Sequence, residues 1–143
     1  KLSIAAVSAS MAFSNAGLGA EHALAHSLGG HFDMRHGVLH PILLTTVMRF
    51  NMTINLPRMA DIGRIILKQQ GGTDYDMATA GINRLDDFFA SFDVPVRLQE
   101  IVPEEDYTVL EALCKMAVHD ACNLTNPRPA TWEELKQICE EVW

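Results

Sequence analysis

The residues of this chain best suited to chemistry are its histidines. Five of the six fall within nineteen consecutive positions of the 143-residue sequence, namely His22, His26, His31, His36 and His40. His22 and His26 are four residues apart in a segment expected to be helical, so both imidazoles project from one face. His36 follows after a helix stop at Gly29-Gly30 and a short return, which lets it approach the same point. Neutral imidazoles favour zinc, iron, copper or nickel over calcium or magnesium, so the spacing predicts a transition-metal site built from His22, His26 and His36.

The other polar residues of this region are expected to have ordinary roles. His31, His40 and His119 are interpreted as core or surface residues, because an isolated histidine on a helix face is seldom a ligand. Glu21 and Asp33 could orient a histidine from outside the ligand shell, but a solvated or helix-capping role is the preferred interpretation.

Helices must position these side chains, because no stretch alternates apolar and polar residues as a strand would. Gly17 and Gly19 permit a bend after the first helix. Pro57 fits the first turn of a helix, and Thr131 with Glu134 has the spacing of a capping box. The fold class is therefore predicted to be all-α, with helices at about 1–15, 21–28, 38–50, 57–68, 73–92, 103–121 and 131–143.

Composition narrows the class of partner. The chain is 48% hydrophobic and 20% charged, as globular domains are. Its net charge of −7 disfavours nucleic acid, since phosphate binding needs clustered Lys and Arg. Three cysteines without C-x-x-C spacing suit reduced thiols, which favours a cytoplasmic location. The opening residues lack a basic segment and are too weakly apolar for a membrane span, so no membrane is expected, and we expect them to belong to a helix cut from a longer protein.

A longer pattern surrounds the histidines. It consists of Asn15-Ala-Gly-Leu-Gly-Ala-Glu-His-Ala-Leu-Ala-His-Ser-Leu-Gly-Gly30, then His36-Gly37, then Ile42-Leu-Leu-Thr-Thr-Val-Met-Arg-Phe-Asn51. This pattern closely resembles the histidine-rich signature of iron-containing, group III alcohol dehydrogenases, and weaker similarity at 120–127 and in the closing helix extends the resemblance over essentially the whole chain. The resemblance implies that residues 1–143 are the C-terminal metal-binding helical domain, a helical bundle of the dehydroquinate synthase-like type. It also implies an N-terminal dinucleotide-binding domain outside this sequence.

By this resemblance, His22 and His36 are two of the metal ligands, whereas His26 lies near the nicotinamide and the substrate, as a cofactor contact and catalytic proton relay. This differs from the spacing argument, which groups His26 with the ligands, and we follow the resemblance. The remaining ligands of the family, an Asp and a His, would lie upstream of Lys1. The implied metal is Fe(2+), with Zn(2+) as the alternative, and the implied cofactor is NAD or NADP, bound by the other domain.

The implied activity is reversible hydride transfer between a small alcohol or aldehyde and the nicotinamide, with the metal polarising the substrate oxygen. The complete enzyme is expected to be a homo-oligomer, and this chain by itself is expected to be inactive and to bind metal weakly. Two alternatives stay open: a stand-alone helical metal-binding or interaction domain without catalysis, and a relative of the zinc-dependent glycerol dehydrogenases.

Overall fold

The computed structural model describes residues 1–143, and its regular structure is entirely helical. The α-helices are α1 (Leu2–Ala16), α2 (Ala20–Phe32), α3 (His36–Leu67), α4 (Asp74–Ala90), α5 (Leu110–Ala117) and α6 (Trp132–Glu141). Short 3-10 helices lie between them: η1 (Leu98–Glu100), η2 (Glu104–Val109) and η3 (Ala121–Thr125). The predicted all-α class is confirmed.

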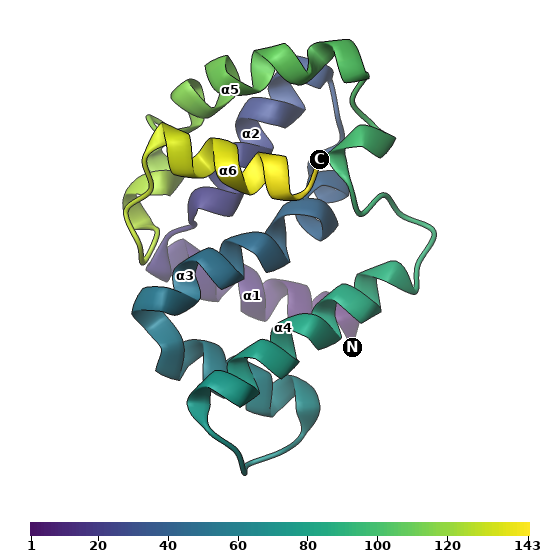
Figure 1. Cartoon of the computed structure of the whole chain (residues 1–143). Coiled ribbons are helices and arrows are strands. Elements are labelled where there is room, and N and C mark those ends of the chain that lie inside the picture. The colour runs from purple at the N-terminus through teal and green to yellow at the C-terminus, as the bar shows by residue number, and fades with distance from the viewer.

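Helix α2 packs between α3 and α5, and α6 lies against both α5 and α3 (Figure 1). Apolar side chains from these four helices form the larger core cluster, which includes the fully buried Leu24 and Leu28 of α2, Leu43 of α3 and Leu135 of α6. Truncating one buried leucine to alanine typically costs about 2–5 kcal/mol. The core therefore fixes α2 against the first half of α3, the two segments that carry the clustered histidines.

Helix α3 is bent at Asn55, whose φ of −122° and ψ of 40° are not helical. Pro57 follows in the first turn of the second half, where its missing N–H breaks no helical hydrogen bond. This second half packs along α4 around a smaller apolar cluster, at the lower end of the molecule in Figure 1. The predicted helix start at Pro57 agrees with this geometry.

Side-chain caps begin two of the helices, and the one at Thr131 was predicted. Thr73 precedes α4, and its hydroxyl accepts a hydrogen bond from the Asp76 N–H. At α6, Thr131 accepts from the Glu134 N–H, and the Glu134 carboxylate accepts from the Thr131 N–H. The capping box therefore forms as its spacing predicts.

The predicted end of the second helix is wrong. Helix α2 does not stop at Gly29-Gly30 but continues to Phe32. It ends at Asp33, which has left-handed φ and ψ angles of 51° and 43° and donates its N–H to the Gly29 carbonyl. Glycine permits a helix end without imposing one, and a Cβ on Gly29 would lie 3.3 Å from the Leu39 side chain of α3. Gly29 thus serves close packing, and Asp33 takes the capping role.

The predicted end of the helix at 103–121 is also wrong. Helix α5 ends at Ala117, and η3 begins after Asp120. The Asp120 carboxylate accepts a hydrogen bond from the Cys122 N–H at 2.7 Å. Because such a side chain competes with the helical carbonyl acceptors, it starts a separate turn.

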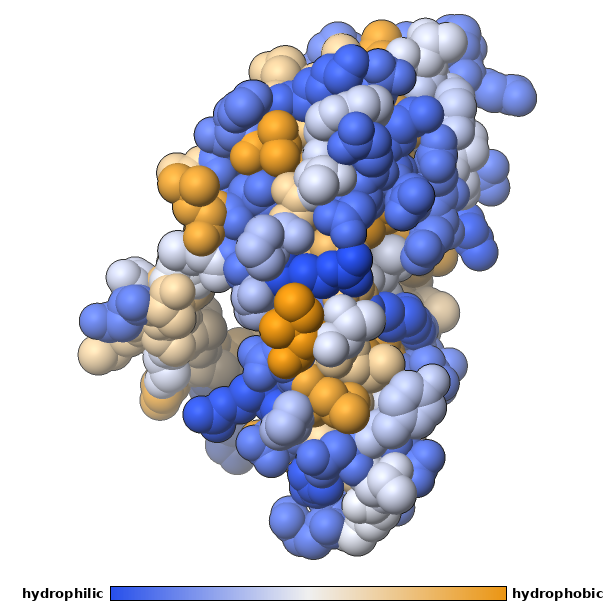
Figure 2. All heavy atoms as spheres, turned by 60° about the vertical axis from the view of Figure 1, so that its left-hand side comes forward, coloured by the Kyte–Doolittle hydropathy of each residue, from blue (hydrophilic) through white to orange (hydrophobic).

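Helix α1 buries none of its residues, although it is rich in apolar ones. Leu2 is 88% exposed and Ile4 72% exposed. Figure 2 shows this helix as an arm that stands off from the body of the molecule on the left. No single helix is long and apolar enough to span a membrane; α1 and α2 reach that length and composition only as a pair bent by 105°.

Helices α3 and α4 touch backbone to backbone at two glycines. A Cβ on Gly63 would lie 1.9 Å from the Met77 carbonyl oxygen, and one on Gly81 would lie 2.4 Å from the Gly63 Cα. Both positions are buried and helical, so the absence of a side chain, and not backbone freedom, is what the contact requires.

We expect Gly63→Ala to destabilise the chain, because the methyl group must push α3 and α4 apart. Overpacking of this kind costs about 1–3 kcal/mol, measurable by urea unfolding. Gly30→Ala is the matched control: it lies in α2 with nothing within 4 Å of its added Cβ, and should stabilise by about 0.5–1 kcal/mol. Equal behaviour of the two variants would contradict the close contact.

Candidate metal centre

Two helices bring four histidines into one cluster. Helix α2 carries His22 and His26, and the first turns of α3 carry His36 and His40, which share a face because they are four residues apart. One ligand atom from each of His22, His36 and His40 lies within 4.8 Å of the others. The structure therefore groups His22 and His36 with His40, whose partnership the sequence interpretation missed.

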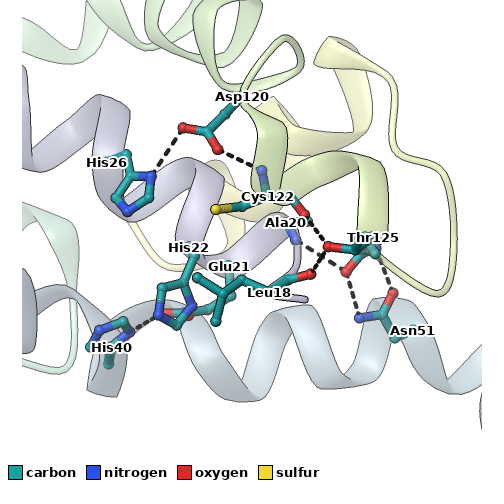
Figure 3. A network of polar contacts seen from close by, with 11 residues as sticks. Leu18, Ala20, Glu21, His22, His26, His40, Asn51, Asp120, Cys122 and Thr125 are labelled. Atoms are coloured by element: carbon teal, nitrogen blue, oxygen red, sulfur yellow. Dashed lines mark hydrogen bonds and ion pairs between the residues drawn. The ribbon is translucent and has the colours of Figure 1, made fainter. Parts of the chain in front are cut away.

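Glu21 lies between the two helices and contacts two of these rings. It is buried, and its carboxylate oxygens accept from Nδ1 of His22 at 2.8 Å and from Nδ1 of His40 at 2.5 Å. Figure 3 shows His22 and His40 side by side at this carboxylate. The preferred sequence interpretation of Glu21, a solvated or capping residue, is wrong, because the approach of α3 covers it.

The electrostatics of the cluster favour neutral rings at two positions. Desolvation by burial lowers the pKa of His22 and of His36, and the neighbouring imidazoles lower both further. The hydrogen bond to Glu21 raises the pKa of His40. Because the neutral imidazole is the form that binds a metal, the environment of His22 and His36 suits ligands.

His26 lies beside this group and has a different partner. Its Nδ1 is 3.0 Å from Oδ2 of Asp120, and its side chain is 44% exposed. Its ring centroid is 6.1 Å from that of His22 and 5.4 Å from that of His36. The contact with Asp120 turns His26 toward the turn before η3 (Figure 3).

Cys122 completes a second set of donor atoms with His26 and Asp120, all within 4.8 Å of one another. Burial raises the pKa of Cys122 to about 11, and the hydrogen bond and negative charge of Asp120 add to this shift. Cys122 is therefore in the thiol form at neutral pH. All three cysteines are free, as predicted, with Cys114 Sγ and Cys139 Sγ 3.9 Å apart in the core.

The start of α2 is held by a buried amide. Gly19 caps the helix without a side chain, and Oδ1 of Asn126 accepts the Ala20 N–H at 3.1 Å in its place. Asn126 also exchanges hydrogen bonds with the buried Asn51 of α3, at 2.8 and 3.1 Å. This junction sets the position of α2 on α3, and hence that of Glu21 and His22.

Close packing at Gly17 explains the glycines of this segment. Gly17 has a φ of 80°, and a Cβ there would lie 2.5 Å from the Thr125 hydroxyl oxygen. That hydroxyl donates to the Leu18 carbonyl. A Cβ on Gly19 would likewise meet Oδ1 of Asn126 at 2.7 Å. The predicted bend at Gly17 and Gly19 is confirmed, and it is shaped by η3.

The histidines outside the cluster have ordinary surroundings. His31 and His119 are exposed, and the His31 ring contacts Phe32. A cavity of about 300 Å³ lies between α3, α4 and the end of α6, near Thr46 and Arg49, and none of the histidines lines it. The cluster thus lies at an open face of the molecule, with His26 and His36 exposed.

Several site residues could have been found from sequence signals. His40 follows His36 at the spacing that also joins His22 to His26. Asp120 and Asn126 lie in the segment 120–127, which the family resemblance had already singled out. Glu21 carried no such signal, since its burial depends on the approach of α3.

These features define an all-helical domain with a candidate imidazole metal site between two helices. The chain belongs to the Fe-containing alcohol dehydrogenase family: residues 1–143 match the family described as "Fe-containing alcohol dehydrogenase family, C-terminal".

Individual relatives agree with this assignment. The chain is 33% identical to 1,3-propanediol dehydrogenase of Citrobacter freundii over 144 residues, 99% of this chain and 36% of the relative. It is 34% identical to lactaldehyde reductase of Escherichia coli (strain K12) over 137 residues, 94% of this chain and 35% of the relative. The solved structure of alcohol dehydrogenase from Oenococcus oeni superimposes with a TM-score of 0.86 at 30% identity, covering 94% of this chain and 35% of that one. The chain therefore spans about a third of the length of these proteins.

We expect Asn126→Ala to cost about 2–4 kcal/mol of stability, because it leaves the Ala20 N–H and the Asn51 amide buried without their partner. Urea unfolding measures the loss. Asn15→Ala is the control, since the Asn15 amide donates only to the Met11 carbonyl on the exposed α1. A loss no greater than in the control would refute the role of the junction.

We expect Asp120→Asn to speed alkylation of Cys122 several-fold at neutral pH. Removing the negative charge lowers the pKa of the thiol from about 11, and each unit raises the thiolate fraction tenfold. The Asn oxygen still accepts the Cys122 N–H, so η3 keeps its cap. Peptide mapping by mass spectrometry follows Cys122 separately from the buried cysteines, with Asp93→Asn as a control. An unchanged or slower alkylation rate of Cys122 would contradict the contribution of Asp120 to the raised pKa of the thiol.

Proposed function

We propose that this chain is the metal-binding helical domain of a metal-dependent alcohol dehydrogenase that uses NAD or NADP. The observation that carries the proposal is the meeting of His22 and His36 donor atoms between α2 and α3, in a chain of the Fe-containing alcohol dehydrogenase family. In this proposal His22 and His36 hold the metal, which is Fe(2+), with Zn(2+) as the alternative.

The donor set fits such an ion. Imidazole nitrogen is a good ligand for iron and zinc, and burial favours the neutral form of His22 and His36 by lowering the pKa of each. When bound, the metal would polarise the alcohol or aldehyde oxygen and the nicotinamide would exchange a hydride with the substrate carbon.

His26 is the residue we propose for proton transfer and for contact with the nicotinamide. Asp120 accepts its Nδ1–H, which fixes the ring plane and leaves Nε2 free to hold a proton. The exposed side chain can pass that proton to solvent. Imidazole is well matched to general acid and base work near neutral pH.

The rest of the protein would complete the site. The cluster is open on one side, and the chain spans about a third of its relatives. We propose that the remaining ligands, the substrate walls and the dinucleotide site come from residues outside this chain. Small alcohols and aldehydes are the proposed substrates, because the relatives are named for 1,3-propanediol and lactaldehyde.

The test is an anaerobic calorimetric titration of the 143-residue chain with Fe(II) and with Zn(II), repeated on His22→Ala and His36→Ala. We expect weak, one-site binding that both variants abolish, because each removes a ligand. His31→Ala is the matched control, since this histidine lies on α2 outside the cluster. We expect no alcohol oxidation with NAD or NADP by the chain alone.

The alternatives give different results. Binding that survives in both variants would remove the proposed ligands. Tight binding that also needs His26 would favour a self-sufficient metal domain without catalysis. Turnover by the chain alone would overturn the division of the site between this domain and the rest of the protein.

A further inference from the structure

His40 has no role in the proposed function, although it lies inside the cluster. We propose that His40 is a third metal ligand supplied by this chain, and that Glu21 is the positioning residue that holds His22 and His40 in the ligand form. The inference rests on the proposed function, in which His22 and His36 bind the metal. It adds His40 as a ligand and Glu21 as the carboxylate that orients the His22 and His40 rings.

The three rings lie close together. Their centroids are 4.4 Å apart for His36 and His40, 4.8 Å for His22 and His40, and 5.2 Å for His22 and His36. Their ligand atoms lie within 4.8 Å of one another. Tetrahedral nitrogen ligands at about 2.1 Å from an ion are about 3.4 Å apart, so closure by at most about 1.4 Å from 4.8 Å would bring the ligand atoms to one ion. The ring centroid of His36 is closer to that of His40 than to that of His22. His40 is therefore as well placed as His22 to share an ion with His36.

Glu21 selects the tautomer that a ligand needs. Its oxygens accept from Nδ1 of His22 and from Nδ1 of His40, so in the neutral form of each ring the proton lies on Nδ1 and Nε2 keeps its lone pair. A ligating histidine usually donates its other ring N–H to a carboxylate or carbonyl in this way, and removing that partner costs about 10–100-fold in metal affinity. One carboxylate here serves a ring on each helix.

The Glu21 carboxylate has no Lys or Arg partner to balance its negative charge. The carboxylate is buried in the first turn of α2, and the side chains that contact its oxygens are the two imidazoles, with no Lys or Arg among them. Buried charges in proteins are normally paired or placed near a metal. A divalent ion on the Nε2 side of the two rings would compensate the carboxylate through them.

A purely structural Glu21–His40 contact between α2 and α3 is the competing explanation, and one substitution separates the two. In His40→Asn, the amide NH₂ can replace Nδ1–H as the hydrogen-bond donor to Glu21. The substitution removes Nε2, the nitrogen that would bind the metal. A structural contact would survive this change, whereas a metal ligand would not.

The direct experiment needs no variant. Long-range ¹H–¹⁵N NMR spectra of the 143-residue chain, recorded with and without Zn(II), report the state of each ring nitrogen. We expect Nε2 of His22, His36 and His40 to shift on metal binding while Nδ1 of His22 and His40 stays protonated. His31 and His119 serve as internal controls and should not shift.

Calorimetry with Zn(II) provides the second measurement. We expect His40→Asn to weaken binding at least tenfold, and Glu21→Gln to weaken it 10–100-fold, since a Gln amide cannot accept from both rings at once. His119→Asn and Glu133→Gln are the exposed controls. Circular dichroism verifies that each variant keeps its helices.

The outcomes separate this inference from the proposed function. If the Nε2 signals of His22 and His36 shift while that of His40 does not, and His40→Asn binds as the wild type does, then His40 is not a ligand and the proposed function stands. If His22 and His36 do not respond, the proposed metal site itself fails. Retained affinity in Glu21→Gln would remove the positioning role of Glu21.

Discussion

The site depends on one buried amide, that of Asn126. It supplies the acceptor that Gly19 lacks at the start of α2, and it pairs with Asn51 of α3 in the same place. A buried N–H or amide without a partner costs about 1–3 kcal/mol, so these groups strongly favour a single arrangement of the two helices. The first turn of α2 is thereby placed against α3, and Glu21 and His22 with it.

Glu21 shows what that placement makes possible. A carboxylate near the helix N-terminus is favoured by the helix dipole, and α3 then covers it and offers His40 as a second partner. Its two contacts fix rings on different helices with a single group. The same contacts use Nδ1 of each ring and leave Nε2 of both rings available to bind a metal ion.

The two carboxylates of this face contact different histidines. Glu21 serves rings that are partly buried and close together, which suits ion binding. Asp120 serves the exposed His26, which suits exchange of a proton with solvent. Asp120 also starts η3 through the Cys122 N–H, and η3 leads into Asn126. The segment that orients His26 therefore also secures α2.

The sequence by itself determined the all-α class, the capping box at Thr131 and the bend at Gly17, because periodicity, capping and backbone conformation act over a few neighbouring residues. The motif around His22 and His36 likewise lies in one continuous stretch and pointed to the family. The end of α2 at Asp33 depended on how Gly29 meets Leu39, which local propensity does not describe.

The tertiary structure alone decided which side chains meet. His40 looked like an isolated histidine and Glu21 like a solvated one until α3 lay across α2. Asp120 reached His26 only through the fold, since 94 residues separate them in the chain. Burial, hydrogen-bond partners and the resulting pKa shifts arise from contacts between distant segments. The spacing of residues along one helix therefore cannot predict them.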